Sequence, residues 1–388
     1  MTQTAAFDAI GIDDLRRAGG LKWSTFPDTI GAFVAEMDFG IAPPITQALH
    51  GAVESGSFGY LPAAQSARLS VACSGWARDR YGWDVDAQDV RPVADVISGL
   101  EMAIRHFSAH GSAVIVPTPA YMPFLTVPGA LGRDVIQLPM AVQDGRSVYD
   151  LDALDAAFVA GGNLLVLCNP HNPVGRVLDR AELAAIAAVV ERHGGRVFSD
   201  EIHAPLVYAG SRHTPYASLD AVTAGHTLTA TSASKAWNLP GLKCAEVILS
   251  NDRDRDLWSQ VGPAAEHGAA NLGVIANTAA FTAGGPWLDD VIAYLDRNRR
   301  ALAGLVRDLL PGVACTPPDG TYLAWLDVRD LGLGAQPAAF FREHAGVAMV
   351  DGTLCGDIGR GFVRYNFATP RPIMERTIDA MAQALAHR

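Results

Sequence analysis

Short apolar runs alternate with longer amphipathic segments through the middle of the chain. Residues 163–168 (NLLVLC) are apolar on both sides, which is typical of strands in a sheet that helices cover on both faces. Residues 180–192 (RAELAAIAAVVER) carry alanine and leucine at helical spacing. This alternation predicts an α/β domain with a mostly parallel sheet. The predicted strands are 112–117, 163–168, 195–199, 227–231 and 245–249.

The pattern changes near Pro286. We predict a large domain over 46–285 and a smaller α+β domain over 286–388. The first 45 residues hold several glycines and prolines, so we expect them to run over the surface and pack with the small domain. The elements predicted in the small domain are a long helix at 287–310, strand 322–327, helix 336–344, strands 347–350 and 361–366, and a final helix from Pro372.

Composition narrows the function classes. The chain has 388 residues, of which 30 are basic and 41 acidic, so its net charge is −11. Without a basic block it is a poor nucleic-acid binder. No apolar stretch of about 18 residues predicts a membrane span, and no signal peptide is evident. The five cysteines are isolated, which favours a reducing compartment. We therefore expect a cytoplasmic protein that binds neither membrane nor nucleic acid and holds no metal.

Candidate chemistry lies where the predicted strands end. Lys235 follows strand 227–231 in the segment SASKAWNLPGLK, where a lysine can form a Schiff base with an aldehyde cofactor. The hydroxyls of Ser232 and Ser234 could hold a phosphate, and Lys243 could add a cation. Taken alone this segment is a weak signal, because solvated lysines after strands are common.

Three other strand ends carry polar or aromatic groups. Asn172 lies in NPHNPVG, which follows strand 163–168; its amide can donate to a phenolate, and its Asn-Pro steps favour a turned loop that admits cis bonds. Asp200 can pair with a protonated pyridine nitrogen, or it is an ordinary helix N-cap. Tyr121 could stack on a flat ring or simply pack. Open α/β sheets bind ligands at this edge, so the set is more specific than its members.

The set resembles pyridoxal 5′-phosphate (PLP) enzymes of the aspartate-aminotransferase fold, which is PLP fold type I. It most resembles the carbon–sulfur β-lyases of the class I/II aminotransferase family, the cystathionine β-lyase subgroup typified by MalY and PatB. The segments that carry the resemblance are AEMDF (35–39), FGY (58–60), PAYMPF (119–124), NPHNPVGR (169–176), DEIH (200–203), SASKAWNLPGLK (232–243) and FVRYNFA (362–368).

The resemblance implies a role for each residue. Lys235 resembles the Schiff-base lysine, Asp200 the partner of the pyridine nitrogen, and Tyr121 the ring-stacking aromatic; these three are the expected catalytic residues. Asn172 resembles a donor to the ring oxygen that also lies at the substrate. Arg364 resembles the clamp on the substrate carboxylate, which suits its planar fork. The other residues implied to bind the cofactor are Val96, Ile97, Ser98, His203, Ser232, Ser234, Lys243 and Tyr60, the last reaching across the interface of a homodimer with shared active sites.

The resemblance also implies a reaction, β-elimination from cystathionine or another S-substituted L-cysteine that yields a thiol, pyruvate and ammonia. An aminotransferase, an enzyme for a larger cysteine conjugate and a regulator acting through protein contacts remain alternatives. Three positions depart from the subgroup: Glu36 stands where aspartate is usual, Asp95 where glycine is usual, and Cys355 where we expect a bulkier residue. A carboxylate beside a phosphate is unfavourable unless it turns away, for example as an N-cap.

Overall fold

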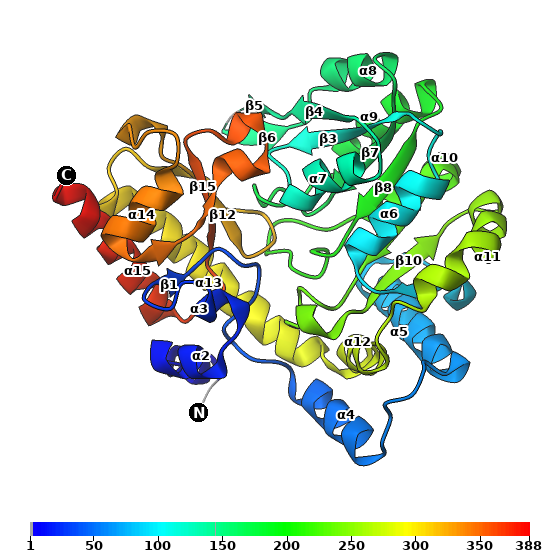
Figure 1. Cartoon of the computed structure of the whole chain (residues 1–388), viewed down its shortest axis with the longest axis horizontal. Helices are drawn as coiled ribbons and strands as arrows, with labels where there is room; N and C mark the ends of the chain where they lie inside the picture. The colour runs from blue at the N-terminus through cyan, green and yellow to red at the C-terminus, as the bar shows by residue number, and fades with distance from the viewer. Residues whose placement is uncertain (1–2, 144) are drawn as a thin grey trace.

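A seven-stranded sheet forms the centre of the larger part of the chain (Figure 1). The computed structural model describes residues 3–143 and 145–388. The strand order is β2-β10-β9-β8-β7-β3-β4, and only β10 runs against its neighbours. The predicted mostly parallel sheet is therefore confirmed. Its strands are β2 (Val90–Val93), β3 (Ala113–Thr118), β4 (Val135–Pro139), β7 (Gly162–Cys168), β8 (Arg196–Asp200), β9 (Thr227–Thr231) and β10 (Ala245–Leu249).

Helices cover both faces of this sheet, which explains the continuous apolar strands. In β7, Leu164 and Val166 join the core cluster that contains α6 (Val96–His106), whereas Leu165 and Leu167 join the cluster on the opposite face. Because side chains alternate across a strand, a strand that is buried on both faces carries apolar residues at successive positions.

Helix α9 (Arg180–Arg192) has the predicted bounds, because the residues that cap its first turn can be recognised in the sequence. Asp179 accepts hydrogen bonds from the N–H groups of Ala181 and Glu182, and Glu182 accepts from the N–H of Asp179. This capping box satisfies the open donors of the first turn. The other helices of the first 283 residues are α1 (Gln3–Asp8), α2 (Ile12–Ala18), α3 (Leu21–Ser24), α4 (Pro43–Glu54), α5 (Ala63–Tyr81), α7 (Met122–Ala130), α8 (Leu151–Val159), α10 (Ala221–His226), α11 (Asp252–Glu266) and α12 (Asn271–Ala283).

The C-terminal unit is built on a four-stranded antiparallel sheet with the order β11-β12-β15-β14. In Figure 1 it lies beside the larger sheet, and the long helix α13 runs from near α12 into the C-terminal unit. The strand predicted over 347–350 is in fact two short strands, β13 and β14, which belong to different sheets. The elements of this unit are α13 (Gly285–Leu309), β11 (Ala314–Cys315), β12 (Leu323–Asp327), α14 (Pro337–Ala345), β13 (Val347–Ala348), β14 (Val350–Asp351), β15 (Phe362–Asn366) and α15 (Arg371–Ala386).

The N-terminal segment does not simply run over the surface, as the sequence led us to expect. Strand β1 (Ile30–Gly31) pairs in parallel with β13, and residues 32–39, here called the strap, continue inward. Asp38 is buried and accepts hydrogen bonds from Lys22 Nζ and Trp23 Nε1, each at 2.8 Å. The buried ion pair between Lys22 and Asp38 fixes the position of the strap.

Two small elements complete the fold. Strands β5 (Ala141–Gln143) and β6 (Arg146–Val148) pair as a short antiparallel ladder. Within residues 3–143 and 145–388, no helix has the length and apolar character needed to cross a membrane.

Candidate active site

The strand ends that the sequence singled out meet at one edge of the large sheet. Asp200 is the last residue of β8 and is in register with Cys168 of β7 and Ala230 of β9. The loop that starts at Asn169 and the loop that carries Lys235 therefore leave the sheet at the level of Asp200. Both Asn-Pro bonds of the 169–175 loop are cis, as the sequence allowed.

Internal hydrogen bonds fix the loop that carries Lys235. Ser232 Oγ donates to the carbonyl of Cys244 at 2.7 Å and accepts from the N–H of Ser234 at 2.9 Å. The ammonium of Lys235 donates to the carbonyl of Ala35 in the strap at 2.9 Å. Because its hydroxyl is occupied in this way, we expect Ser232 to support the loop rather than to touch a ligand.

The pKa of Lys235 is low for a lysine. Burial, followed by the nearby Arg364 charge, lowers the pKa of Lys235 to about 8, although Glu36 and Asp200 act in the opposite direction. Near neutral pH about a tenth of such an amine is unprotonated, against well under a thousandth for an ordinary lysine. Lys235 is therefore suited to nucleophilic attack on an aldehyde.

Asp200 is a buried carboxyl group without strong stabilisation of its charge. One oxygen accepts from the N–H of Ile202 at 3.0 Å, but burial outweighs this bond and raises the pKa of Asp200 to about 7. Its neighbour Glu201 turns the other way, towards Ser199 Oγ at 2.9 Å and His213 Nε2 at 3.0 Å. A cationic ligand group at Asp200 would relieve the cost of its buried charge.

His203 is buried and uncharged. Burial, with the charges of Lys235 and Arg364, lowers the pKa of His203 to about 3. Its ring meets that of Tyr322 edge to face at 6.0 Å. His203 Nδ1 and Arg364 Nε are buried polar atoms without a hydrogen-bond partner in the part of the chain that the structure describes. Such atoms are uncommon unless a ligand satisfies them.

Arg364 joins three parts of the chain. It lies on β15 of the C-terminal unit, and its two terminal nitrogens donate to the carbonyl of Phe33 in the strap at 2.8 Å and to Asn172 Oδ1 at 3.1 Å. The planar guanidinium can bind a carboxylate through two parallel hydrogen bonds. A carboxylate bound here would lie close to Asn172.

A further pair of charged groups lies at the start of α6. Asp95 is its N-cap, and one oxygen accepts from the N–H and the hydroxyl of Ser98 at 2.8 and 2.9 Å. The other oxygen pairs with Lys243 Nζ at 2.9 Å. Val96 and Ile97 are the first two residues of α6, and their N–H groups point out of the helix end. The side chains of Lys243 and Asp95 are 60% and 38% exposed, so this end of the site, here called the phosphate end, is open. The end formed by Lys235, Asp200 and Arg364 is called the reacting end.

Tyr121 follows strand β3. It caps α7 and meets Phe124 edge to face at 5.5 Å. Burial raises the pKa of Tyr121, and the charges of Arg364, Asp200 and Asp95 also act on it. It therefore shares one electrostatic environment with residues from both ends of the site.

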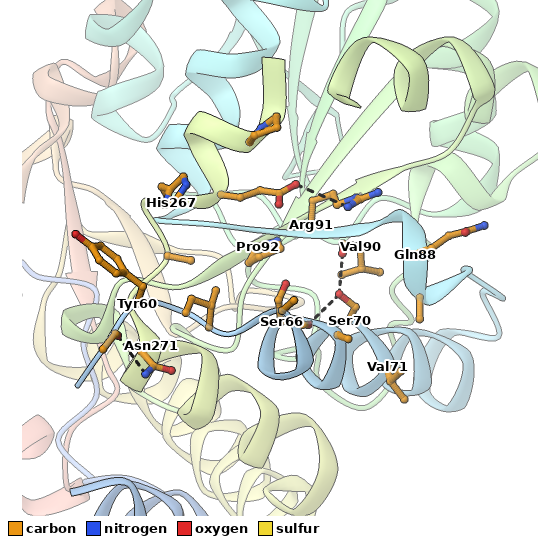
Figure 2. Close-up of a pocket in the computed structure, with 18 residues that line it drawn as sticks. Tyr60, Ser66, Ser70, Val71, Gln88, Val90, Arg91, Pro92, His267 and Asn271 are labelled. Carbon is orange, nitrogen blue, oxygen red and sulfur yellow. Dashed lines mark hydrogen bonds and ion pairs between the residues drawn. The ribbon is translucent and has the colours of Figure 1, made fainter. Parts of the chain in front are cut away.

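Tyr60 is the predicted site residue that does not lie with the others in the single chain. Its side chain is 94% exposed, and it lines an open groove of about 740 Å³ beside α5 and β2. Figure 2 shows Tyr60, His267 and Asn271 at one end of this groove and Gln88 at the other. Within the described chain, Tyr60 is the one predicted site residue among those that line it.

Sequence reasoning missed the part of the site that the strap provides. The carbonyl of Ala35 accepts from both Lys235 and the hydroxyl of Tyr322, each at 2.9 Å. Asn366 donates to the carbonyls of Val34 and Glu36. Backbone carbonyls leave no side-chain motif. The only available signals were AEMDF itself and the tyrosine in GTYLAW (320–325).

Comparison with known proteins identifies the class. Residues 34–381 match the model of the family described as aminotransferase class I and II, and the chain belongs to this family. It is 37% identical to the cystathionine beta-lyase of Corynebacterium glutamicum over 96% of this chain and 99% of that one. It is 34% identical to the cystathionine beta-lyase PatB of Bacillus subtilis, covering 87% and 88%.

Solved structures show the same fold. The crystal structure of cystalysin from Treponema denticola, which contains a PLP cofactor, superposes with a TM-score of 0.90 at 28% identity, covering 97% of this chain and 98% of that one. The fold is thus that of the fold type I PLP enzymes. The predicted fold and family are confirmed.

Proposed function

We propose that the chain is a PLP-dependent carbon–sulfur β-lyase that converts cystathionine or another S-substituted L-cysteine to a thiol, pyruvate and ammonia. The names of its relatives support the reaction. The observation that carries the proposal is the meeting of an amine of low pKa, a buried carboxyl and an arginine at one sheet edge.

The residues present fit PLP in three places. Lys235 offers an amine for the aldehyde, Asp200 a buried carboxylate for the protonated ring nitrogen, and Ser98 with Lys243 polar donors for the phosphate. The buried, unpaired Nδ1 of His203 adds a donor or acceptor beside Asp200. When bound, PLP supplies an electron-withdrawing ring that takes up the electrons left at the substrate Cα.

The chain's own groups account for substrate binding and proton transfer. Arg364 would bind the substrate carboxylate through its fork, with Asn172 beside it. Lys235 Nζ, held near the carbonyl of Ala35, would accept the proton from Cα, since a pKa of about 8 suits both uptake and return of a proton near neutral pH. Asp200 would keep the ring nitrogen protonated. A thiolate on Cβ can then leave, and the aminoacrylate that remains is hydrolysed by water to pyruvate and ammonia after its release.

Single-substrate turnover tests this function against the aminotransferase alternative. The loaded enzyme is incubated with L-cystathionine in the absence of any keto acid. We expect thiol and pyruvate in equal amounts over many turnovers. Turnover that stops after one equivalent and resumes only with an added keto acid would make the chain an aminotransferase. A panel of cysteine thioethers then identifies the leaving group.

We also propose that the enzyme is a homodimer in which Tyr60 enters the partner's site. The phosphate end of the site is open in a single chain, while Tyr60 is almost fully exposed. A second copy that covers the groove of Figure 2 would bury Tyr60, and we expect its own Tyr60 to close the phosphate end.

Mixed dimers test this sharing. Lys235→Ala lacks the amine but keeps Tyr60, whereas Tyr60→Ala keeps the amine. If each site takes Lys235 from one copy and Tyr60 from the other, refolding the two variants together restores about a quarter of wild-type activity, because half the dimers are mixed and each has one intact site. No recovery, in dimers verified by sedimentation, would refute the shared site.

A further inference from the structure

Asp95 makes one contact that a helix cap does not need. An N-cap side chain has to satisfy one or two N–H groups of its helix. Asp150 and Asp179, which cap α8 and α9, accept only from such N–H groups in the described chain. Asp95 accepts from the N–H and the hydroxyl of Ser98, as Asp220, which caps α10, does from Thr223, and in addition from Lys243, 148 residues along the chain.

The two side chains that donate to Asp95, those of Ser98 and Lys243, are ones that the proposed function assigns to the cofactor phosphate. The two oxygens of Asp95 engage the N–H and Oγ of Ser98 and the ammonium of Lys243 at 2.8 to 2.9 Å. Partial burial acts to raise the pKa of Asp95, but the bonds from Ser98 and Lys243 outweigh it and lower the pKa. At neutral pH a full negative charge therefore lies at the helix N-terminus, where the helix dipole favours an anion.

We infer that Asp95 is an internal competitor of the cofactor phosphate, holding Ser98 and Lys243 in the cofactor-free chain and giving them up when PLP binds. The inference rests on the proposed function and adds a residue that sets cofactor affinity. The carboxylate acts in two ways. It occupies the two polar side chains that the phosphate would need, and its negative charge would repel a dianion bound to the same donors.

The competition has two consequences for the enzyme. The cofactor-free chain keeps its phosphate cradle satisfied, because the ammonium of Lys243 and the hydroxyl of Ser98 both have a partner. The same contacts weaken the hold on PLP, so cofactor exchange should be faster than in an enzyme with a neutral residue at position 95.

Asp95→Asn is the decisive variant, because asparagine caps helices as well as aspartate does but carries no charge. Affinity is measured by titrating the cofactor-free protein with PLP and following the absorbance of the bound cofactor. Pyridoxal, which lacks the phosphate, is titrated in parallel. Asp150→Asn is the matched control, since it changes an N-cap aspartate of the same kind at α8.

We expect Asp95→Asn to lower the dissociation constant for PLP about tenfold. The constant for pyridoxal should change less than about twofold, and Asp150→Asn should change neither. Inorganic phosphate should compete with PLP more strongly in Asp95→Asn than in wild type. Asp95→Ser, another neutral cap, should repeat the result and exclude an effect peculiar to asparagine.

Two results would overturn the inference. PLP affinity that stays the same or falls in Asp95→Asn would mean that Asp95 positions Lys243 for the phosphate instead of competing with it. An equal gain for PLP and pyridoxal would mean that the effect does not act through the phosphate. A wild-type chain that binds no PLP is a different result, because it removes the proposed function itself.

Discussion

Two aspartates at the same sheet edge are held in opposite ways. Asp200 is buried, and the pKa of its carboxyl is raised to about 7. Asp95 is partly exposed, accepts three hydrogen bonds, and has a lowered pKa. The first carboxylate lacks a counter-charge that a ligand can bring, whereas the second already has its partners. At the reacting end Asp200 can therefore bind a cationic group of the cofactor. At the phosphate end Asp95 already binds the Ser98 hydroxyl and the Lys243 ammonium.

Turnover should require Lys235 at the reacting end, whereas it should not require Lys243 at the phosphate end. Lys235→Ala is expected to lower turnover at least about a thousandfold, because both the nucleophile and the proton acceptor are lost. Lys243→Ala should mainly weaken PLP binding, so that saturating PLP recovers most of the turnover. Pyruvate release at rising PLP concentration measures both. Equal, unrecoverable losses would remove the distinction between the two ends.

The strap belongs to the reacting end, and its ion pair should be costly to break. Lys22→Met leaves the buried Asp38 charge unpaired, which is expected to cost about 3–5 kcal/mol of unfolding free energy. Urea unfolding of the cofactor-free protein measures it, with the exposed pair variant Arg78→Met as control. A loss no larger than the control's would show that the strap is not held by this pair.

Asp200 and Asp95 should respond to neutralisation with opposite signs. The pKa of Asp200 is higher in the folded chain, about 7, than in the unfolded chain, about 4. The folded state then binds more protons between these values, so stability falls as pH rises from about 4 to about 7. Asp200→Asn should therefore stabilise the cofactor-free protein at pH 8 by roughly 2–4 kcal/mol, with no gain below about pH 4, while turnover collapses.

Asp95→Asn is the counterpart of that experiment. Because the pKa of Asp95 is lowered, its charge stabilises the folded chain at neutral pH, and that contribution is lost as pH falls through the folded pKa. The variant should melt slightly lower than wild type without cofactor at pH 8. Thermal unfolding of both variants across pH checks the pair, and shifts of the same sign would contradict the comparison.

Cofactor uptake should follow the pKa of Lys235. Only the neutral amine attacks the aldehyde, so the rate of PLP uptake should rise about tenfold per pH unit below pH 8 and level off above it. Stopped-flow absorbance between pH 6 and pH 10 measures this rate. A rate that still rises above pH 9 would place the amine in an ordinary lysine environment.

The sequence predicted the regular parts of the molecule and the side chains that act at strand ends. Strands such as β9 and β10 and helix α9 have the predicted bounds, because apolar runs and a capping box are local signals. The strap was missed because it contributes carbonyl groups, and a buried Lys22 reads as a surface residue. Asp95 stood out as a departure, but Lys243 as its partner is a long-range contact that no local pattern contains.

The pairing of β1 with β13 sets an order of events during synthesis. Residues 95, 98 and 243, which form the phosphate end, leave the ribosome well before strand β13 and Arg364 exist. The strap cannot settle until Val347 is available to pair with Ile30, so the reacting end is among the last features to form. A nascent chain can thus satisfy Ser98 and Lys243 with Asp95 before residues 347–364, which complete the reacting end, are available.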